Sequence, residues 1–337
     1  MASPEDFFYQ RTAMRPTART WIKHLILLLI TLVTATVAGT LYPFGFNAAF
    51  PGGEPQSGQE LIQFLFSLPA LYLGFVIDAV RLLLSNAEYL KYGLSFSFSL
   101  LFILVSHEMG HYVACRLYGV DATLPYFIPM PPMIGPAGTF GAFIKIKSPM
   151  PSRKAVFDIG VAGPIAGFLA LIPIAIIGVA TMETVVPNQG VGESAIVFAD
   201  PLMMKLIGAA FGKDPQFGIG NAFYFAAWVG LLVTALNLIP SGQLDGGHAI
   251  YAVLGAGVHR WTGRVAFVVM AVLSIVGWFV FNSPSGFLIA VLLGIMMRIR
   301  HPEPWDKSPL DPKRKFIAIM TLVIFIVSFA PFPIRIT

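Results

Sequence analysis

Charged side chains are scarce in this sequence. Asp, Glu, Lys and Arg make up 12% of its 337 residues, whereas 56% are hydrophobic. An average soluble domain is roughly 25% charged. A soluble fold of this length cannot bury so much apolar surface, but a protein that uses lipid as its solvent does not need to. The composition therefore predicts an integral membrane protein, with the lipid bilayer as its main partner.

Cysteine is almost absent, since Cys115 is the one cysteine in the chain. This excludes a disulfide scaffold and a zinc site built from several cysteines. Cys115 follows His111 by four residues, so the two can share a helix face. We interpret Cys115 as a small buried hydrophobic residue rather than a participant in chemistry.

Two further features are missing. No basic stretch is interleaved with aromatics as a base-stacking surface would be, so no nucleic-acid partner is predicted. No segment is both long and polar enough to form a separate soluble domain; the segment 182–220 is too short for one. The basic residues instead cluster between apolar runs, at 11–23, 145–154, 259–264 and 298–315, which is typical of cytoplasmic loops.

Apolar runs of roughly membrane-spanning length recur along the chain. They cover 25–42, 63–84, 94–117, 156–181, 221–240, 264–281, 284–299 and 316–333, of which 284–299 is short for a span. Asp78 and Arg81 interrupt the second run, and at three residues apart they can pair on one helix face. We therefore expect 63–84 to be an interfacial or broken helix rather than a full span.

The charge pattern predicts an orientation. The N-terminus carries Arg11, Arg15, Arg19 and Lys23, which places it in the cytoplasm. The loop 43–60 has acidic residues and no Lys or Arg, so it is expected outside. If 63–84 does not cross, the run 94–117 ends on the cytoplasmic side, where the basic stretch 145–154 follows. The segment 182–220 is then external.

The region 123–155 lacks a helical pattern. It is rich in proline and glycine and then gives an extended run over 139–147. An apolar but irregular segment of this kind can be a re-entrant loop or hairpin inside a protein-lined interior. An ordinary interfacial loop is the alternative, and the pattern does not separate the two.

A metal-binding motif lies in the second half of the run 94–117. Residues 106–111 read Ser-His-Glu-Met-Gly-His, so a helix places His107 and His111 on one face. Two imidazoles at this spacing can bind one Zn²⁺. Glu108 stands beside the first ligand and can act as general base toward a water molecule. Ionisable groups at membrane depth are costly and usually functional.

Two histidines leave a catalytic zinc site short of a third protein ligand. Residues 237–248 follow another apolar run and read Asn-Leu-Ile-Pro-Ser-Gly-Gln-Leu-Asp-Gly-Gly-His. Asp245 is trailed by Gly246 and Gly247, which allow the chain to leave helical geometry and bring the carboxylate to a metal. His248 is a rival by chemistry alone, and the spacing favours Asp245 without deciding between them.

The motif His107-Glu-Met-Gly-His111 combined with Asn237-x-x-Pro240-x-x-x-Leu244-Asp245-Gly246 resembles the site-2 protease family of intramembrane metalloproteases. Residues 160–168, Gly-Val-Ala-Gly-Pro-Ile-Ala-Gly-Phe, resemble the Gly-Pro segment of the same family. The resemblance covers about 94–250, the three-helix catalytic core. It implies His107, His111 and Asp245 as ligands of one zinc ion per chain and Glu108 as the catalytic acid and base. Asn237 would hold the substrate backbone or an oxyanion.

The resemblance also implies a fold and a substrate. The fold is an all-α polytopic membrane protein, with a three-helix core, flanking transmembrane helices and a short re-entrant β-like hairpin after the motif helix. We place the flanking N-terminal part at 1–93, the protease core at 94–255 and the C-terminal helices at 256–337. The substrate would be a transmembrane helix of another protein. The predicted location is the bacterial inner membrane with the active site toward the cytoplasm, and an organelle membrane is the alternative. No oligomeric state is predicted.

A helical peptide bond is shielded by its own hydrogen bonds, so a substrate helix must unwind before attack. An extended segment can then pair with an exposed strand edge. The run 139–147 is the candidate edge, with Thr139, Phe140 and Gly141 as substrate-binding residues. A membrane metal-ion transporter is the rival function, because intramembrane His and Asp also carry cations. That rival offers no reason for Glu108 beside His107.

Overall fold

Long apolar helices dominate the fold. The computed structural model describes residues 15–41, 57–132, 137–184, 196–299 and 301–336. Within them, five helices are long and apolar enough to cross a membrane, namely α2, α3, α4, α5 and α8. The prediction of a mostly helical, multi-pass membrane protein is confirmed. Arg11, residues 43–56 and residues 133–136 lie outside the described residues.

The described elements follow in chain order. They are α2 (Ala18–Leu41), α3 (Gly58–Ser85), α4 (Ala87–Leu117), β1 (Tyr126–Pro129), β2 (Thr139–Phe143), α5 (Arg153–Thr181), β3 (Glu183–Thr184), β4 (Ile196–Phe198), α6 (Leu202–Ala210), η1 (Pro215–Phe217), β5 (Gly218–Ile219), α7 (Ala222–Leu238), α8 (Asp245–Phe281), α9 (Ser285–Met296), α10 (Pro312–Ser328) and β6 (Ile334–Ile336). The strands pair antiparallel as β1–β2, β3–β5 and β4–β6.

Polar side chains fix where the core helices begin. The Asn86 side chain accepts a hydrogen bond from the Glu88 backbone N–H at 2.9 Å and starts α4. Ser152 accepts from the Ala155 N–H at 3.1 Å and starts α5. Asn221 does the same for α7. Such caps satisfy backbone donors that have no partner within the helix.

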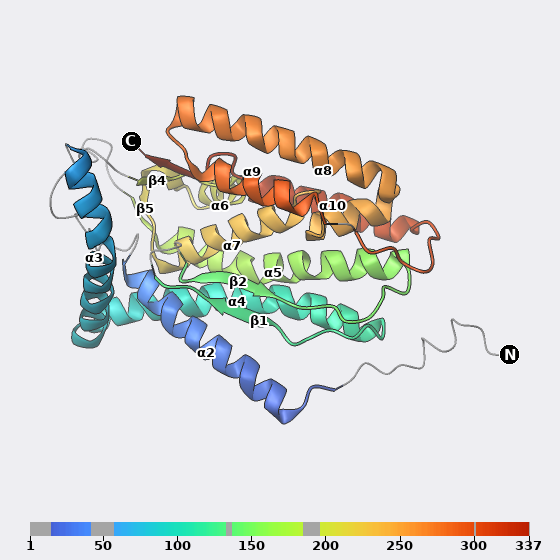
Figure 1. The fold of residues 1–337 in the computed structure, drawn as a ribbon, viewed down its shortest axis with the longest axis horizontal. Helices are drawn as coiled ribbons and strands as arrows, with labels where there is room; N and C mark the ends of the chain where they lie inside the picture. The colour runs from blue at the N-terminus through green and yellow to red at the C-terminus, as the bar shows by residue number, and fades with distance from the viewer. Residues whose placement is uncertain (1–14, 42–56, 133–136, 185–195, 300, 337) are drawn as a thin grey trace.

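Helices α4, α5 and α7 pack together as the centre of the molecule (Figure 1). Large, fully buried side chains of these helices form one apolar core, and Phe96, Leu171 and Trp228 are among them. Cys115 is also buried, in the apolar cluster between α4 and α5. The structure therefore agrees with the interpretation of Cys115 as a packing residue. The boundaries 94 and 255 of the protease core stay a prediction.

Helix α8 differs from the prediction. The expected run 264–281 is the second half of one element, Asp245–Phe281, which bends at Gly255. Gly255 has φ +86°, a conformation that side-chain-bearing residues rarely adopt, so glycine permits the bend. The polar residues after the bend suggested a loop, but they include no proline. The helix continues with Arg260 exposed and His259 buried.

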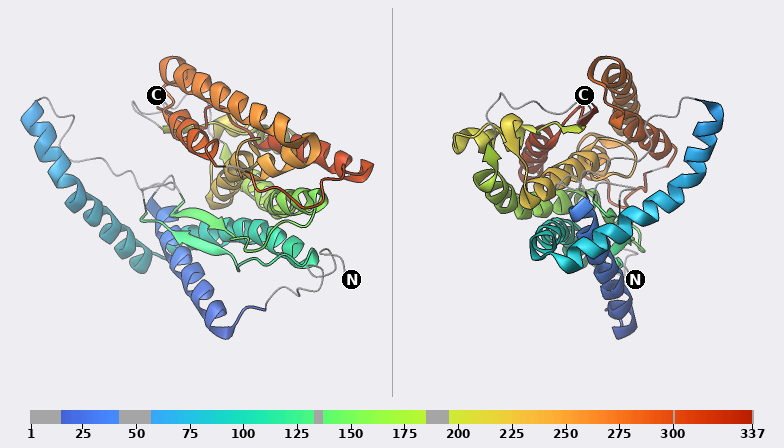
Figure 2. Two further views of the ribbon diagram at one scale, coloured as in Figure 1. Left: turned by 45° about the vertical axis from the view of Figure 1, so that its right-hand side comes forward. Right: turned by 90° about the vertical axis from the view of Figure 1, so that its left-hand side faces the viewer.

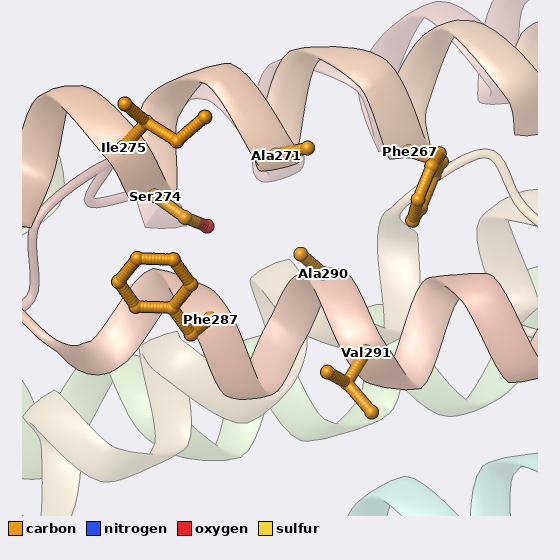
Figure 3. Close-up of a pocket in the computed structure, with 7 residues that line it drawn as sticks. All are labelled: Phe267, Ala271, Ser274, Ile275, Phe287, Ala290 and Val291. Atoms are coloured by element: carbon orange, nitrogen blue, oxygen red, sulfur yellow. The ribbon is translucent and has the colours of Figure 1, made fainter.

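A small apolar pocket of about 240 Å³ separates part of α8 from α9 (Figure 3). Its lining consists of Phe267, Ala271, Ser274 and Ile275 from α8 and Phe287, Ala290 and Val291 from α9. Since the lining has no metal ligand and no acid or base, it is not the site that the motifs predict.

Helix α3 runs across one end of the bundle, at a large angle to α4 and α5 (Figures 1 and 2). Asp78 and Arg81 pair as expected, with 3.5 Å between Arg81 Nη1 and Asp78 Oδ1, and both side chains are exposed. By length and composition α3 is able to cross a membrane. The expectation that it does not fully cross stays a prediction.

The short hairpin expected after α4 is present as β1 and β2. Tyr126 pairs with Phe143 and Phe127 with Ala142. Helix α2 holds the hairpin from the side: the His24 ring donates from Nδ1 to the Pro125 carbonyl at 2.8 Å. The Thr34 hydroxyl donates to the Gly138 carbonyl, also at 2.8 Å. Whether the hairpin enters the bilayer stays a prediction.

Candidate metal centre

Three side chains from two distant parts of the chain meet in the interior. His107 and His111, one turn apart on α4, are 4% and 7% exposed. Their Nε2 atoms are 3.2 Å apart. Asp245, the first residue of α8, places its Oδ2 atom 3.3 Å from each of them. The structure thus brings together the three residues that the family resemblance implies as ligands.

The triangle formed by these three atoms fits a zinc ion. Zinc binds histidine nitrogen and carboxylate oxygen at about 2.0–2.1 Å in tetrahedral geometry, which separates neighbouring ligand atoms by roughly 3.3 Å. The three observed separations are 3.2, 3.3 and 3.3 Å. Three protein ligands leave a fourth position for a reactant, as in catalytic zinc sites.

Hydrogen bonding orients the His111 ring. Its Nδ1 lies 2.7 Å from the Ile159 carbonyl oxygen on α5. Because a carbonyl only accepts, Nδ1 carries the proton and donates, and the lone pair of Nε2 faces the metal position. Asn237 near the end of α7 lies with its Nδ2 3.3 Å from His107 Nε2. Asn237 is therefore at the edge of the centre, while its role toward substrate stays a prediction.

Glycines of α5 make room for the two histidines. A Cβ atom at Gly163 would lie 2.1 Å from His111 Nε2. At Gly167 it would lie 3.0 Å from His107 Cβ. The Gly-Pro segment at 160–168 therefore has a steric function here, because any larger residue at 163 would occupy the place of a ligand ring.

The glycines after Asp245 act differently from the expectation. Gly246 and Gly247 do not let the chain leave helical geometry, since both lie inside α8. They allow close approach instead: a Cβ at Gly246 would lie 2.0 Å from the Leu238 carbonyl oxygen. The residue with a left-handed conformation is instead Gly242, with φ +56°. It lies in the turn between α7 and Asp245. His248 turns to His301 and is not in the metal group.

Glu108 is buried beside the ligands, with 6% of its surface exposed. Its carboxylate is within hydrogen-bond reach of the Ile144 backbone N–H, just beyond β2. The hairpin edge that faces away from β1 is thus next to Glu108. The catalytic role of Glu108 stays a prediction.

The proposed substrate-binding residues sit on that hairpin and not in the metal group. The Thr139 hydroxyl donates to the Ile128 carbonyl at 2.9 Å and accepts from the Gly141 N–H at 3.0 Å. Phe140 is 68% exposed. Gly141 has φ +91°, and no atom lies within 4 Å of the position that a Cβ would take. Among the described residues β2 pairs with β1 alone, which leaves its second edge without a strand.

Sequence reasoning missed two contributors. The Ile159 carbonyl has no side-chain signature, and only the fold places it against His111. His301 lies 53 residues from His248, and nothing in the local pattern connects them. A histidine close to a basic, polar loop was the one signal available for His301.

A buried His-His-Asp group with a glutamate beside its first histidine, carried on membrane-length helices, defines a multi-pass membrane zinc metalloprotease. The family model described as Peptidase family M50 matches residues 95–279. The chain belongs to this family, and the resemblance to site-2 proteases is confirmed.

Curated relatives agree with this assignment. The chain is 29% identical over 274 residues to "Probable zinc metalloprotease EGY2, chloroplastic" of Arabidopsis thaliana, a match of 77% of this chain and 46% of the relative. It is 30% identical over 248 residues to "Probable zinc metalloprotease EGY1, chloroplastic" of the same plant, a match of 71% and 43%. The chain therefore spans less than half the length of the curated relatives it matches.

Proposed function

We propose that this protein hydrolyses a peptide bond in or near a transmembrane helix of another membrane protein. The observation that carries the proposal is the buried group of His107, His111 and Asp245 with Glu108 beside it, on helices of membrane length. A protease of this kind acts on protein, and the apolar surroundings of the site favour a substrate that is itself in the bilayer.

The residues divide the chemistry among them. His107, His111 and Asp245 would hold zinc, which when bound supplies Lewis-acid activation of water and of the scissile carbonyl. Glu108 takes a proton from the attacking water and delivers it to the leaving amine. Asn237 offers an amide N–H₂ at the edge of the group and would donate to the substrate backbone or to the developing oxyanion.

The hairpin would receive the unwound substrate. An extended segment pairing with the unpaired edge of β2 exchanges its lost helical hydrogen bonds for new ones, which offsets the cost of exposing polar backbone in an apolar site. The position of the Ile144 N–H beside Glu108 supports this arrangement, because that edge leads a bound segment to the catalytic carboxylate.

The orientation and location belong to the same proposal. The chain would start in the cytoplasm, and α3 would lie at the outer end of the bundle without crossing. Its position across the end at which α4 begins supports this (Figure 1). The site then opens toward the cytoplasmic side of a bacterial inner membrane. The names of the two plant relatives favour the organelle alternative, in which the stroma takes the place of the cytoplasm.

Membership of a peptidase family argues against the transporter alternative. A transport site also gives no role to a buried glutamate beside the first histidine. The full chain, purified in detergent, is expected to hold about one zinc ion and to cleave a single-span membrane substrate.

Removing the metal gives the direct test of the proposed function. Treatment with 1,10-phenanthroline followed by desalting should abolish cleavage of the single-span substrate, and added Zn²⁺ should restore it, because the metal supplies the Lewis acid. Zinc content by mass spectrometry and product by gel are measured on the same samples. Continued cleavage by zinc-free protein would overturn the proposal.

The strand edge can be tested with one proline. The Lys145 carbonyl accepts from the N–H of Thr123, which lies just before β1, so by alternation along the chain the Ala142 N–H faces the open edge of β2. Ala142→Pro removes that donor and should lower cleavage about tenfold, the equivalent of a hydrogen bond of roughly 1.5 kcal/mol. Zinc content should not change.

Ala142→Gly is the matched control, since it keeps the N–H and loses only a methyl group. Equal cleavage by the proline and glycine variants would contradict edge pairing. Loss of zinc in the proline variant would assign the effect to the metal centre instead.

A further inference from the structure

Three histidines and one tyrosine form a cluster close to the metal centre but outside it. His248 and Tyr251 come from the first turns of α8, and His259 from just after its bend. His301 comes from the connecting segment, residues 301–311, between α9 and α10. The His301 ring stacks on Tyr251 with 4.0 Å between centroids and 10° between planes, and its centroid is 5.2 Å from that of His259.

The hydrogen bonds of this cluster have a defined direction. His301 Nδ1 lies 2.8 Å from the Pro302 carbonyl oxygen, and His301 Nε2 lies 2.7 Å from His248 Nδ1. Burial lowers the pKa of His301 to about 3, so the ring is neutral. Its proton must be on Nδ1, since a carbonyl only accepts. His301 Nε2 therefore accepts, and His248 donates from Nδ1.

This cluster supports the residues on both sides of Asp245. His248 lies three residues after Asp245, one helical turn away. Its Cβ packs against Gly160, where an added Cβ would lie only 2.7 Å from it. Gly160 follows Ile159, whose carbonyl orients His111. On the other side, His259 Nε2 donates to the carbonyl of Gly242 at 2.9 Å. The first turn of α8 has no side-chain cap, so its position depends on these contacts.

The connecting segment is itself fixed to the start of α5. The Trp305 N–H donates to the Met150 carbonyl at 3.2 Å, and the Arg153 N–H donates to the Asp306 carbonyl at 2.9 Å. Beyond the segment, Arg314 holds Asp158 with Nε at 2.9 Å from Oδ1 and Nη2 at 2.5 Å from Oδ2. Forked pairing of this kind fixes geometry as well as charge.

We propose that His301 is a positioning residue of the metal centre: by accepting a hydrogen bond from His248, it holds the first turn of α8 so that Asp245 meets the two histidines. The inference rests on the metal group used in the proposed function. It also gives a role to a segment that lies beyond residues 95–279 matched by the family model.

Two substitutions separate the hydrogen bond from the ring. His301→Phe keeps a ring to stack on Tyr251 and loses the acceptor, whereas His301→Gln keeps an acceptor and loses the ring. In competition with a chromogenic chelator, the phenylalanine variant of the full chain should bind zinc about tenfold more weakly, the effect expected from the loss of one buried hydrogen bond. The glutamine variant should bind nearly as tightly as the unaltered protein.

A double-mutant cycle with His248→Phe distinguishes this bond from general packing. If the bond carries the effect, the double variant loses no more zinc affinity than either single variant. Additive losses, or wild-type affinity in His301→Phe, would overturn the inference. Zinc affinity is measured without substrate, so these outcomes are separate from a failure of the proposed function, which would appear as absence of cleavage by the zinc-loaded unaltered chain.

Discussion

Replacing Glu108 with glutamine should abolish cleavage while zinc stays bound. Glutamine has nearly the shape of glutamate and can still pair with the Ile144 N–H, but it takes no proton from water. A positioned general acid and base contributes about 10²–10⁴-fold to rate, so the loss should be of that size. The measurement compares initial cleavage rates of a single-span substrate and zinc per chain in the two proteins.

Glu88→Gln is the matched control for this substitution. Glu88 is on the same helix but exposed and paired with Lys91 at 2.6 Å, far from the ligands along the chain. Its replacement should leave the cleavage rate unchanged, since exposed ion pairs contribute little to stability. Product release by zinc-loaded Glu108→Gln at the rate of the unaltered protein would reject hydrolysis by the proposed route.

The second large effect is expected at Gly163. An added methyl group would lie 2.1 Å from His111 Nε2, the atom that faces the metal. The ring has to move, and it cannot do so without breaking the 2.7 Å hydrogen bond to Ile159. Gly163→Ala should therefore weaken zinc binding by roughly 100-fold or more and remove cleavage with it. Chelator competition on the purified variant measures the affinity.

Gly178→Ala tests whether any crowded glycine of α5 has the same effect. A Cβ at Gly178 would lie 2.6 Å from the Tyr224 backbone nitrogen, at the opposite end of the helix from the ligands. This variant should lose thermal stability but keep its affinity for zinc. Similar zinc affinities in the two alanine variants would show that Gly163 has no special relation to the metal.

Local patterns were enough to predict the first half of the metal centre. The four-residue spacing of His107 and His111 requires only a helix, and α4 is one. Asp245 was harder, because spacing alone did not exclude His248, and the resemblance decided between them. Only the fold explains why His248 is not a ligand: it is hydrogen bonded to His301, which the chain brings back after two more helices.

The errors have a common physical origin. Glycine was interpreted as a source of backbone freedom at 246 and 247, whereas both positions are helical and need glycine for close packing. The polar stretch around Arg260 was interpreted as a loop, but an exposed helix face also accepts polar residues. In each case tertiary contacts, which a local pattern does not contain, decided the outcome.

The two hydrogen bonds between α2 and the hairpin have a consequence for biosynthesis. His24 and Thr34 are ten residues apart, so they clamp the hairpin at points separated by about 15 Å of helix. Helix α2 precedes the hairpin in the chain and leaves the ribosome long before it. The strand that would receive substrate therefore forms against a helix that was synthesised earlier, and α2 sets its alignment.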